Sequence, residues 1–368
     1  MKNLPPFEDL PVHTLAGIFN NTTNSYKIYW FYSILQIIKS ENKAVITFDE
    51  IFAKMIASAW YPTNYFKVSL GKQDKIGRAI EEIKNIANLK DDDKPEIVYA
   101  TILEHLRNSK GIRSIISYFE RYVPYRLLSP FFKNELKGKI DGNKKNLIID
   151  IANKSFLENS PVVFYCFPDK NTIELHPTWF RYFKHNIAIV EGFCLWNMVN
   201  FLQKRNPNIP NIGEKLFWVP EKRDLKKARK FWNIVFDSKS VNCIYSGQPI
   251  SQTNYSIDHF IPWSFVTHDL LWNLIPIQKT INSAKSNNLP ALNTYFEDFA
   301  KIQFEAYHLI YSKQKGLLED YVFLFDEEID KIASLSNSEF SEKLYNQIAP
   351  LTQIAANSGF SSNWILNA

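Results

Sequence analysis

Four side chains near residues 258–285 have the types and spacing of a hydrolytic site. Asp258 and His259 are adjacent, and Asn282 and Lys285 follow, three residues apart. Carboxylate and amide oxygens are hard ligands, which suit Mg²⁺ or Mn²⁺ when other positions stay open for water and phosphate oxygens. The imidazole is the one group of this set that can take a proton from water near pH 7. These residue types therefore predict metal-assisted hydrolysis.

Two expected strands lead to the Asp-His pair. The stretch 243–250, CIYSGQPI, predicts a strand with a tight turn, and residues 255–260 predict a second strand that carries Asp258 and His259 at its end. Neighbouring residues of a strand face opposite ways, so both side chains can serve one site only if the strand ends or bulges there. Pro262 is consistent with such an end.

A turn and a helix complete the expected module. Gly247 is free to take a positive φ in the tight turn. A helix over 278–286 would place Asn282 and Lys285 on one face, because residues three apart are neighbours on a helix surface.

The order of these residues resembles that of an HNH, or ββα-metal, nuclease. The resemblance rests on C-x-Y-S-G-x-x-I from Cys243, D-H-x-x-P-x-S-F from Asp258, the Asn at 273, and N-x-x-K-S-x-N-x-P from Asn282. It covers roughly residues 240–292 and is closest to the HNH domain type of RNA-guided CRISPR effector nucleases. The flanks do not resemble the remainder of such an effector, so the resemblance does not imply an RNA-guided role.

The resemblance implies a role for each matched residue. Asp258 and Asn282 would hold the metal ion, and His259 would be the general base that activates water. Asn273 would fasten the loop to its own backbone and orient the site, with a turn-forming Asn as the alternative. Lys285 would approach the scissile phosphate, with a solvated surface lysine as the alternative.

Some positions depart from the family pattern. Ser246 stands where many HNH domains have a zinc-binding cysteine, so no structural zinc is expected. Ser256 stands where RNA-guided members often have an acid two residues before the aspartate. Tyr245 is expected to support the site rather than to react in it. His268 and Asp269 have no assigned role and are expected at the surface.

A basic segment lies directly before this module. Residues 204–230 hold nine Lys or Arg against three acids, a net charge of +6 that exceeds the +5 of the whole chain. A helix over 224–235 would present Lys226, Lys227, Arg229 and Lys230, either to nucleic-acid phosphates or to solvent. Residues 319–330 hold six acids and no base. That acidic run would repel DNA, and could cap the basic segment or face a protein partner.

The predicted fold is α+β and mostly α-helical. Four regions are expected: a helical region 1–155, a β-hairpin with helices over 156–235, the HNH module over 236–300, and C-terminal helices over 301–368. Helices are expected at Tyr26–Ile38, from the Thr47/Glu50 capping box to a stop at Tyr61-Pro62, at Gln73–Leu89, from Pro95 towards Asn108, and at Ile112–Tyr122.

The middle of the chain shows a change of pattern. PVVFYCF, four turn residues and TIELH predict a β-hairpin. One helix is expected from Pro177 to Gln203, with a core face formed by Trp179, Phe183, Ile187, Val190 and Trp196.

Three cysteines without CxxC spacing argue against a zinc ribbon and a disulfide framework, which predicts a reduced, cytoplasmic compartment. No signal peptide and no apolar run of the ~20 residues needed to span a bilayer is expected.

The leading hypothesis is a Mg²⁺- or Mn²⁺-dependent endonuclease that acts on DNA, with RNA as the other candidate substrate. A single site would nick one strand, and a homodimer could cut both. The large flanking regions, which are not part of the family pattern, suit an anti-phage, restriction-type or mobile-element nuclease. The alternatives are a non-catalytic nucleic-acid-binding scaffold with an HNH fold, and a nuclease subunit that stays silent until a sensor or partner protein engages it.

Overall fold

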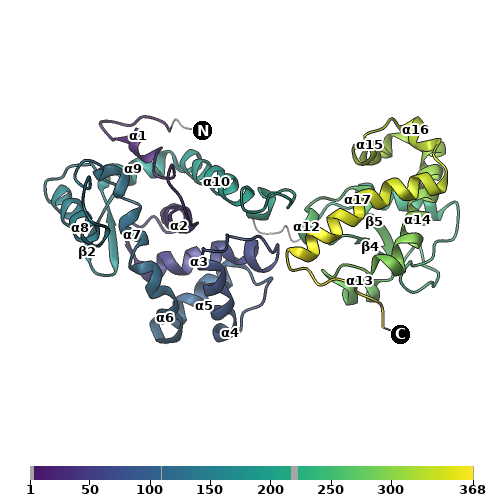
Figure 1. Ribbon diagram of the computed structural model, residues 1–368, viewed down its shortest axis with the longest axis horizontal. Helices are drawn as coiled ribbons and strands as arrows, with labels where there is room; N and C mark the ends of the chain where they lie inside the picture. Colours follow the sequence, from purple (N-terminus) through teal and green to yellow (C-terminus); the bar gives the residue numbers. More distant parts are fainter. Residues whose placement is uncertain (1–3, 109, 217–222, 368) are drawn as a thin grey trace. The chain divides into compact units, whose positions relative to one another are not determined.

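The protein is described by a computed structural model that covers residues 4–108, 110–216 and 223–367. The described chain forms two compact units, one of residues 4–207 with 215–216 and one of residues 208–214 with 223–367 (Figure 1). Helices dominate both units, and the strands form one three-stranded and one two-stranded sheet. The predicted α+β, mostly helical fold is therefore confirmed. The finer division into four regions stays a prediction.

The N-terminal unit combines helices with an antiparallel sheet of order β1-β3-β2, in which Val45 pairs with Glu174 and Tyr165 with Leu175. The hairpin of β2 and β3 confirms the one predicted from the sequence. The elements of this unit are α1 (Val12–Leu15), α2 (Tyr26–Glu41), β1 (Val45–Thr47), α3 (Phe48–Asn64), α4 (Ile76–Ala87), α5 (Pro95–Asn108), α6 (Lys110–Glu120), α7 (Val123–Arg126), η1 (Ser129–Phe132), α8 (Asp141–Leu157), β2 (Tyr165–Asp169), β3 (Thr172–Leu175), α9 (Pro177–His185) and α10 (Ile187–Gln203). A short 3-10 helix, η2 (Glu214–Leu216), lies at the sequence boundary between the units.

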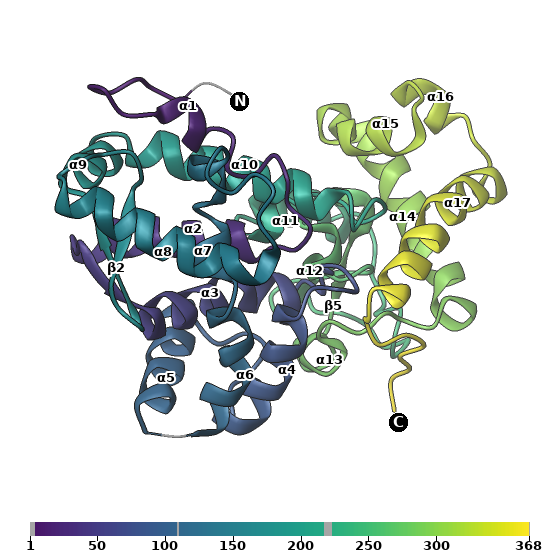
Figure 2. The ribbon, with the colours of Figure 1, turned by 60° about the vertical axis from the view of Figure 1, so that its left-hand side comes forward.

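Aromatic side chains form much of the core of the N-terminal unit. Trp30 of α2 is fully buried and packs edge to face against Phe48 and Phe52 of α3, at ring-centroid distances of 5.4 and 5.2 Å. Such edge-to-face pairs add to the free energy gained by burying the rings. Helices α4, α5 and α6 lie side by side below this core (Figures 1 and 2).

The start of α3 was predicted correctly and its end was not. Thr47 caps the helix through the predicted capping box with Glu50. Pro62, expected to stop the helix, lies inside its last turn. Pro62 lacks the N–H that would bond to the carbonyl four residues earlier, so α3 loses one hydrogen bond there. Trp60 and Tyr61 hold that turn by donating to the carbonyl oxygens of Lys90 and Asp92, at 2.8 and 2.9 Å.

The single helix expected over residues 177–203 is two helices, α9 and α10. Asn186 lies between them with non-helical dihedral angles, and its amide donates to the carbonyl oxygen of Tyr182 at 3.1 Å, which ends α9. Of the expected core face, Trp179, Phe183 and Val190 are fully buried, but Trp196 is 52% exposed. The prediction assumed one continuous helix, and its residue spacing does not carry across the break at Asn186. The core prediction for Trp196 was therefore wrong.

The C-terminal unit contains the two-stranded sheet. Its strands are antiparallel, with Asp258 opposite Ile275 and His259 opposite Leu274. The elements of this unit are α11 (Lys226–Phe236), β4 (Ser256–His259), α12 (Trp263–Val266), η3 (Leu271–Asn273), β5 (Leu274–Ile277), α13 (Lys279–Lys285), α14 (Leu292–Lys313), η4 (Lys315–Leu317), α15 (Glu319–Phe325), α16 (Ile329–Ala333) and α17 (Asn337–Asn357).

Helices on either side stabilise this small sheet. Phe299 of α14 stacks on Phe260, with 4.0 Å between ring centroids. Trp232 of α11 is fully buried and its indole N–H donates to the carbonyl oxygen of Leu274 at 3.2 Å. A two-stranded hairpin is marginally stable by itself. The flanking helices therefore supply the packing that β4 and β5 need.

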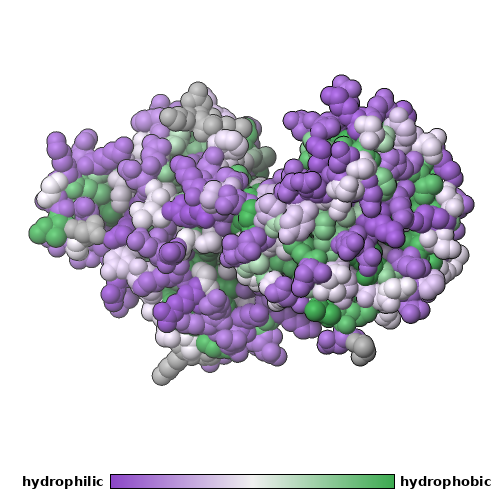
Figure 3. Space-filling model, turned by 45° about the vertical axis from the view of Figure 1, so that its right-hand side comes forward, coloured by the Kyte–Doolittle hydropathy of each residue, from purple (hydrophilic) through white to green (hydrophobic). Residues whose placement is uncertain are grey.

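Hydrophilic residues cover most of the face shown in Figure 3, with smaller hydrophobic areas between them. Over residues 4–108, 110–216 and 223–367, no helix is both long enough and apolar enough to cross a membrane. The three cysteines are buried and free.

Candidate active site

The Asp-His pair lies at the end of β4, as the sequence requires for both side chains to serve one site. β4 ends at His259, and both Asp258 and His259 are only 4% exposed. The first predicted strand is absent as a strand. Only Asn242 and Pro249 form an isolated bridge, around a turn in which Gly247 has φ +70°. The turn closes too soon after residue 243 for a ladder to extend.

Lys285 is bound to the carboxylate of Asp258. Its ammonium lies 3.2 Å from a carboxylate oxygen of Asp258 and donates at 2.7 Å to the backbone carbonyl of His259. Lys285 is fully buried, so a solvated surface lysine is excluded. Burial lowers the pKa of Lys285, and the neighbouring carboxylate opposes that shift. The Tyr245 hydroxyl donates to the same carboxylate at 3.1 Å, which is the supporting position expected for it.

The imidazole of His259 is held by Asp269, a residue expected from the sequence to lie at the surface. His259 Nε2 lies 2.8 Å from Asp269 Oδ1, so Nε2 carries the proton and donates to the carboxylate. The side chain of Asp269 is 27% exposed, so it is partly buried rather than fully at the surface. Its contact with His259 makes it part of the site. The sequence held no signal for this contact because Asp269 lies in an irregular loop.

The remaining ring nitrogen of His259 is then a lone-pair acceptor. Arg223 Nη1 lies 3.4 Å from Nδ1 and 3.5 Å from Asp269 Oδ1, so the guanidinium lies beside the imidazole. Burial lowers the pKa of His259; the hydrogen bond to Asp269 opposes this, and the charge of Arg223 adds to it. A lowered pKa keeps the imidazole neutral near pH 7, which is the form that can accept a proton. Arg223 belongs to the basic segment but was not singled out from the sequence.

Asn273 connects the two sides of the loop that follows His259. Its amide donates to the carbonyl oxygen of Ile261 at 2.9 Å and accepts from the N–H of Ile261 at 2.8 Å. The backbone N–H of Phe260 also donates to the carbonyl oxygen of Asn273 at 2.8 Å. Asn273 is fully buried, so these bonds fix the backbone after the Asp-His pair. Its contribution to catalysis stays a prediction.

The oxygen atoms of Asp258 and Asn282 are of the type that a hard divalent cation prefers. A carboxylate offers about four lone-pair sites, so Asp258 retains some beside Tyr245 and Lys285. Asn282 is half-buried in α13, and its amide makes no hydrogen bond with any residue that the structure describes. One carboxylate and one amide leave positions for water and phosphate oxygens, as Mg²⁺ prefers. No cluster of three or more His, Cys, Asp or Glu suited to a metal occurs in the described part of the chain.

The predicted basic helix is observed as α11, and all four of its selected cations are exposed. Lys227 also donates to Asp320 at 2.6 Å, whereas Lys226, Arg229 and Lys230 do not pair with the acidic run. Asp320 also accepts from the N–H of Leu271 at 2.9 Å. One member of the acidic run therefore pairs with the basic helix. Residues 217–222 of the basic segment lie outside the described residues.

Comparison with known proteins agrees with this geometry. Residues 243–291 match the model of a family described as HNH endonuclease. No curated protein and no solved structure matches the chain. The match spans both site strands, Asn273 and α13. HNH endonucleases are nucleases that generally depend on a divalent metal ion, so this segment is similar to enzymes that hydrolyse nucleic acid.

Proposed function

We propose that the C-terminal unit is a metal-dependent endonuclease that hydrolyses phosphodiester bonds of DNA. The observation that carries this proposal is the buried imidazole of His259, which lies 2.8 Å from Asp269 through Nε2 and follows Asp258 at the end of β4. A positioned base next to a ligand for a hard cation is the arrangement that hydrolysis of a phosphodiester requires.

His259 would take a proton from the attacking water at Nδ1, because Nε2 is already occupied by its bond to Asp269. The water oxygen forms a bond to phosphorus as the bond to the 3′-oxygen breaks, which leaves a 5′-phosphate, and the released 3′-oxygen takes a proton from a solvent water to become a 3′-hydroxyl. A divalent metal held by Asp258 and Asn282 would supply positive charge to the phosphate and leaving oxygens. Lys285 fixes the orientation of Asp258, and Asn273 fixes the backbone beyond His259.

One such site cuts one strand, so nicking is the proposed basal activity, and a homodimer could cut both strands. An anti-phage or restriction-type role is proposed by analogy with stand-alone nucleases that carry large flanking regions.

Incubation of the purified chain with supercoiled plasmid and Mg²⁺ or Mn²⁺ tests the proposal. Nicked plasmid should accumulate with the wild type and not with EDTA or with His259→Ala. Matched single-stranded DNA and RNA substrates establish the preferred nucleic acid. Binding of all these substrates without cleavage would favour the scaffold alternative.

The burial of His259 favours a second candidate, a nuclease that is silent until a partner acts. The imidazole is 4% exposed, and Arg223 lies beside the nitrogen that must reach water. Arg223 also stacks over Trp263, with 5.1 Å between guanidinium and ring centroid. In the plasmid experiment, cleavage that begins only after a partner protein is added selects this candidate.

Asp269→Ala is expected to lower kcat for nicking by about 10²-fold with little change in KM, because the imidazole loses the bond that orients it. Asp269→Asn retains an oxygen acceptor for Nε2–H and should recover part of the rate. Single-turnover nicking measures the effect, and Glu297→Ala, at an exposed acid of α14, is the matched control. A normal rate for Asp269→Ala would remove this residue from the site.

Reversing three exposed cations of α11, as Lys226→Glu, Arg229→Glu and Lys230→Glu together, is expected to weaken DNA binding, and Lys227 is left in place because it pairs with Asp320. The slope of log affinity against log salt should fall by about 0.9 for each phosphate that the helix no longer neutralises. Fluorescence anisotropy over a salt series measures both quantities. Lys313→Glu with Lys331→Glu, at exposed sites of the same unit, is the control. An unchanged slope would show that this face of α11 is only solvated.

A further inference from the structure

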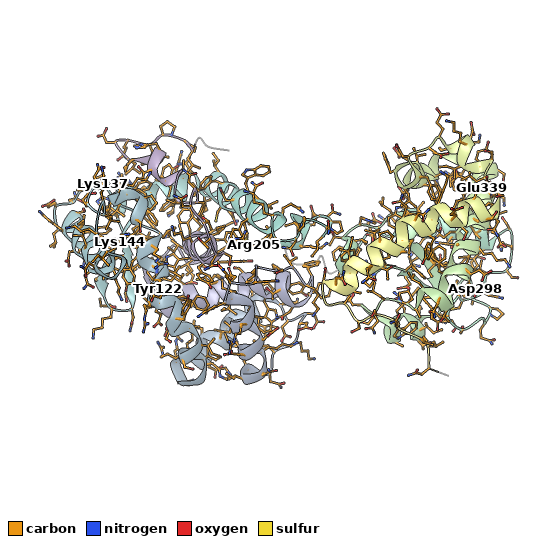
Figure 4. The ribbon with its side chains drawn as sticks, viewed as in Figure 1. Tyr122, Lys137, Lys144, Arg205, Asp298 and Glu339 are labelled. Atoms are coloured by element: carbon orange, nitrogen blue, oxygen red, sulfur yellow. The ribbon has the colours of Figure 1, made fainter. Side chains whose placement is uncertain are left out.

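Three adjoining hollows in the N-terminal unit form one groove, which we call the Arg126 groove. Their volumes are about 170, 240 and 480 Å³, and Arg126 lines all three. Tyr122 and Lys144 each line two of them. Tyr122, Lys137 and Lys144 are labelled on this unit, close to α7 and α8, in Figure 4. The groove is thus built within one compact unit.

The Arg126 groove is strongly cationic. No described Asp or Glu lines it. Lys27, Lys133 and Lys137 form no ion pair with any residue that the structure describes. Burial lowers the pKa of Lys27, and the positive charge of Arg126 lowers it further. The cations that line the groove are Lys27, Arg121, Arg126, Lys133, Lys137, Lys144 and Lys145. Such a concentration of like charge is relieved by a bound anion.

Exposed aromatic rings lie among these cations. Tyr118 and Tyr122, four residues apart, are 39% and 36% exposed, and their ring centroids are 5.9 Å apart. The guanidinium of Arg126 lies 4.7 Å from the ring centroid of Tyr122. Proteins that bind single-stranded nucleic acid combine a cationic groove with exposed aromatic rings, because phosphates meet the cations and unstacked bases stack on the rings. An acidic peptide would use the charge but not the ring faces.

We propose that the Arg126 groove binds a single-stranded segment of nucleic acid, with phosphates on Lys27, Lys133 and Lys137 and an unstacked base on Tyr122. The groove lies in the other unit from His259, so this binding does not depend on cleavage. It goes beyond the proposed nuclease activity, since it gives the N-terminal unit a ligand of its own.

Binding is measured with the full chain carrying His259→Ala, in EDTA, so that no substrate is cut. The probe is fluorescein-labelled oligodeoxythymidylate, with a duplex of equal length and polyglutamate as competitors. Groove variants are Lys133→Glu with Lys137→Glu, Tyr122→Ala, and the conservative Tyr122→Phe. The matched charge control is Lys72→Glu with Lys90→Glu, at exposed lysines of the same unit that do not line the groove. Each variant is also made with α11 reversed, which removes the proposed binding face of the C-terminal unit.

With α11 reversed, the chain should still bind the oligonucleotide, and Lys133→Glu with Lys137→Glu should abolish most of that binding. The salt slope should fall by about 0.7 for each phosphate that the groove no longer neutralises. Tyr122→Ala should weaken binding about five- to 150-fold, the range for loss of one stacked base, and Tyr122→Phe should restore it. Thermal unfolding checks that Tyr122→Ala is folded.

Equal effects of the groove reversal and the Lys72/Lys90 control would overturn the proposal. So would unchanged affinity in Tyr122→Ala, or equal competition by polyglutamate, since either result would leave only a site for polyanions. These outcomes are independent of nicking, so failure of the groove and failure of the nuclease are distinguishable.

Discussion

His259→Ala is expected to lower the single-turnover rate of plasmid nicking by about 10²- to 10⁴-fold, the usual contribution of a general base. The physical reason is the loss of the one neutral acceptor that Asp269 orients and that burial keeps deprotonated. The rate is measured at saturating enzyme with Mg²⁺, so that weaker substrate binding does not contribute.

His259→Gln serves as the matched control for this prediction. Glutamine fills much of the same buried space and can bond to Asp269, but it is not a base at neutral pH. Both variants should therefore lose activity while keeping the fold, as judged by thermal unfolding. A glutamine variant that cuts within tenfold of the wild-type rate would mean that another group deprotonates the water.

Lys285→Met is expected to lower the free energy of unfolding of the C-terminal unit by about 3–5 kcal/mol, because it leaves the buried Asp258 carboxylate without its cation. Methionine is unbranched and of similar length, so a large cavity is avoided. Urea unfolding followed by hydrogen exchange of residues 243–291 reports on this unit.

A double-mutant cycle separates charge from packing at this position. Asp258→Asn with Lys285→Met removes both charges and should recover much of the loss, since replacing both partners of a buried ion pair is often close to neutral. Lys279→Met, at an exposed lysine of the same helix α13, should change stability by less than about 0.5 kcal/mol. If the double variant is no more stable than Lys285→Met, the ion pair is not the source of the effect.

Local signals in the sequence predicted much of the secondary structure. The capping box of Thr47 and Glu50 is present as expected, α5 runs from Pro95 to Asn108, and the hairpin of β2 and β3 forms where turn residues separate two apolar runs. Each of these features depends on neighbours in the chain, which a sequence displays directly. The end of α3 and the break at Asn186 depend on interactions with distant or competing groups, so the pattern alone misplaced them.

The candidate site was predicted only in part, for the same reason. Asp258, His259, Asn273, Asn282 and Lys285 were selected from motif spacing, and their catalytic and metal-binding roles stay predictions. Asp269 and Arg223 were missed. Asp269 lies in an irregular loop and Arg223 in a charged segment, and neither segment has a periodic pattern from which the contacts of its side chains could be predicted. The three-dimensional contacts with the imidazole reveal both.

The net charge of the sequence likewise does not predict where cations gather in the folded protein. Outside residues 204–230 the summed charge is close to neutral, so nothing in the composition points to a polyanion site there. The fold gathers Lys27 with cations from residues 121–145 into the Arg126 groove, while acids such as Glu50 and Asp49 pair elsewhere with Lys43 and Arg113. The summed charge of the sequence cannot show that cations and acids are separated in space, because that separation depends on which residues become neighbours in the fold.

By itself the sequence determined the fold class, most helices, and the order of the HNH-like residues, since these follow from local propensity and spacing. The tertiary structure alone decided that Lys285 is buried against Asp258, that Asp269 holds the imidazole of His259, and that a cationic groove with exposed tyrosines occurs in the other unit. Those facts depend on interactions between residues far apart in the chain, and the free energy of burial and of charge pairing is fixed only when the chain has folded.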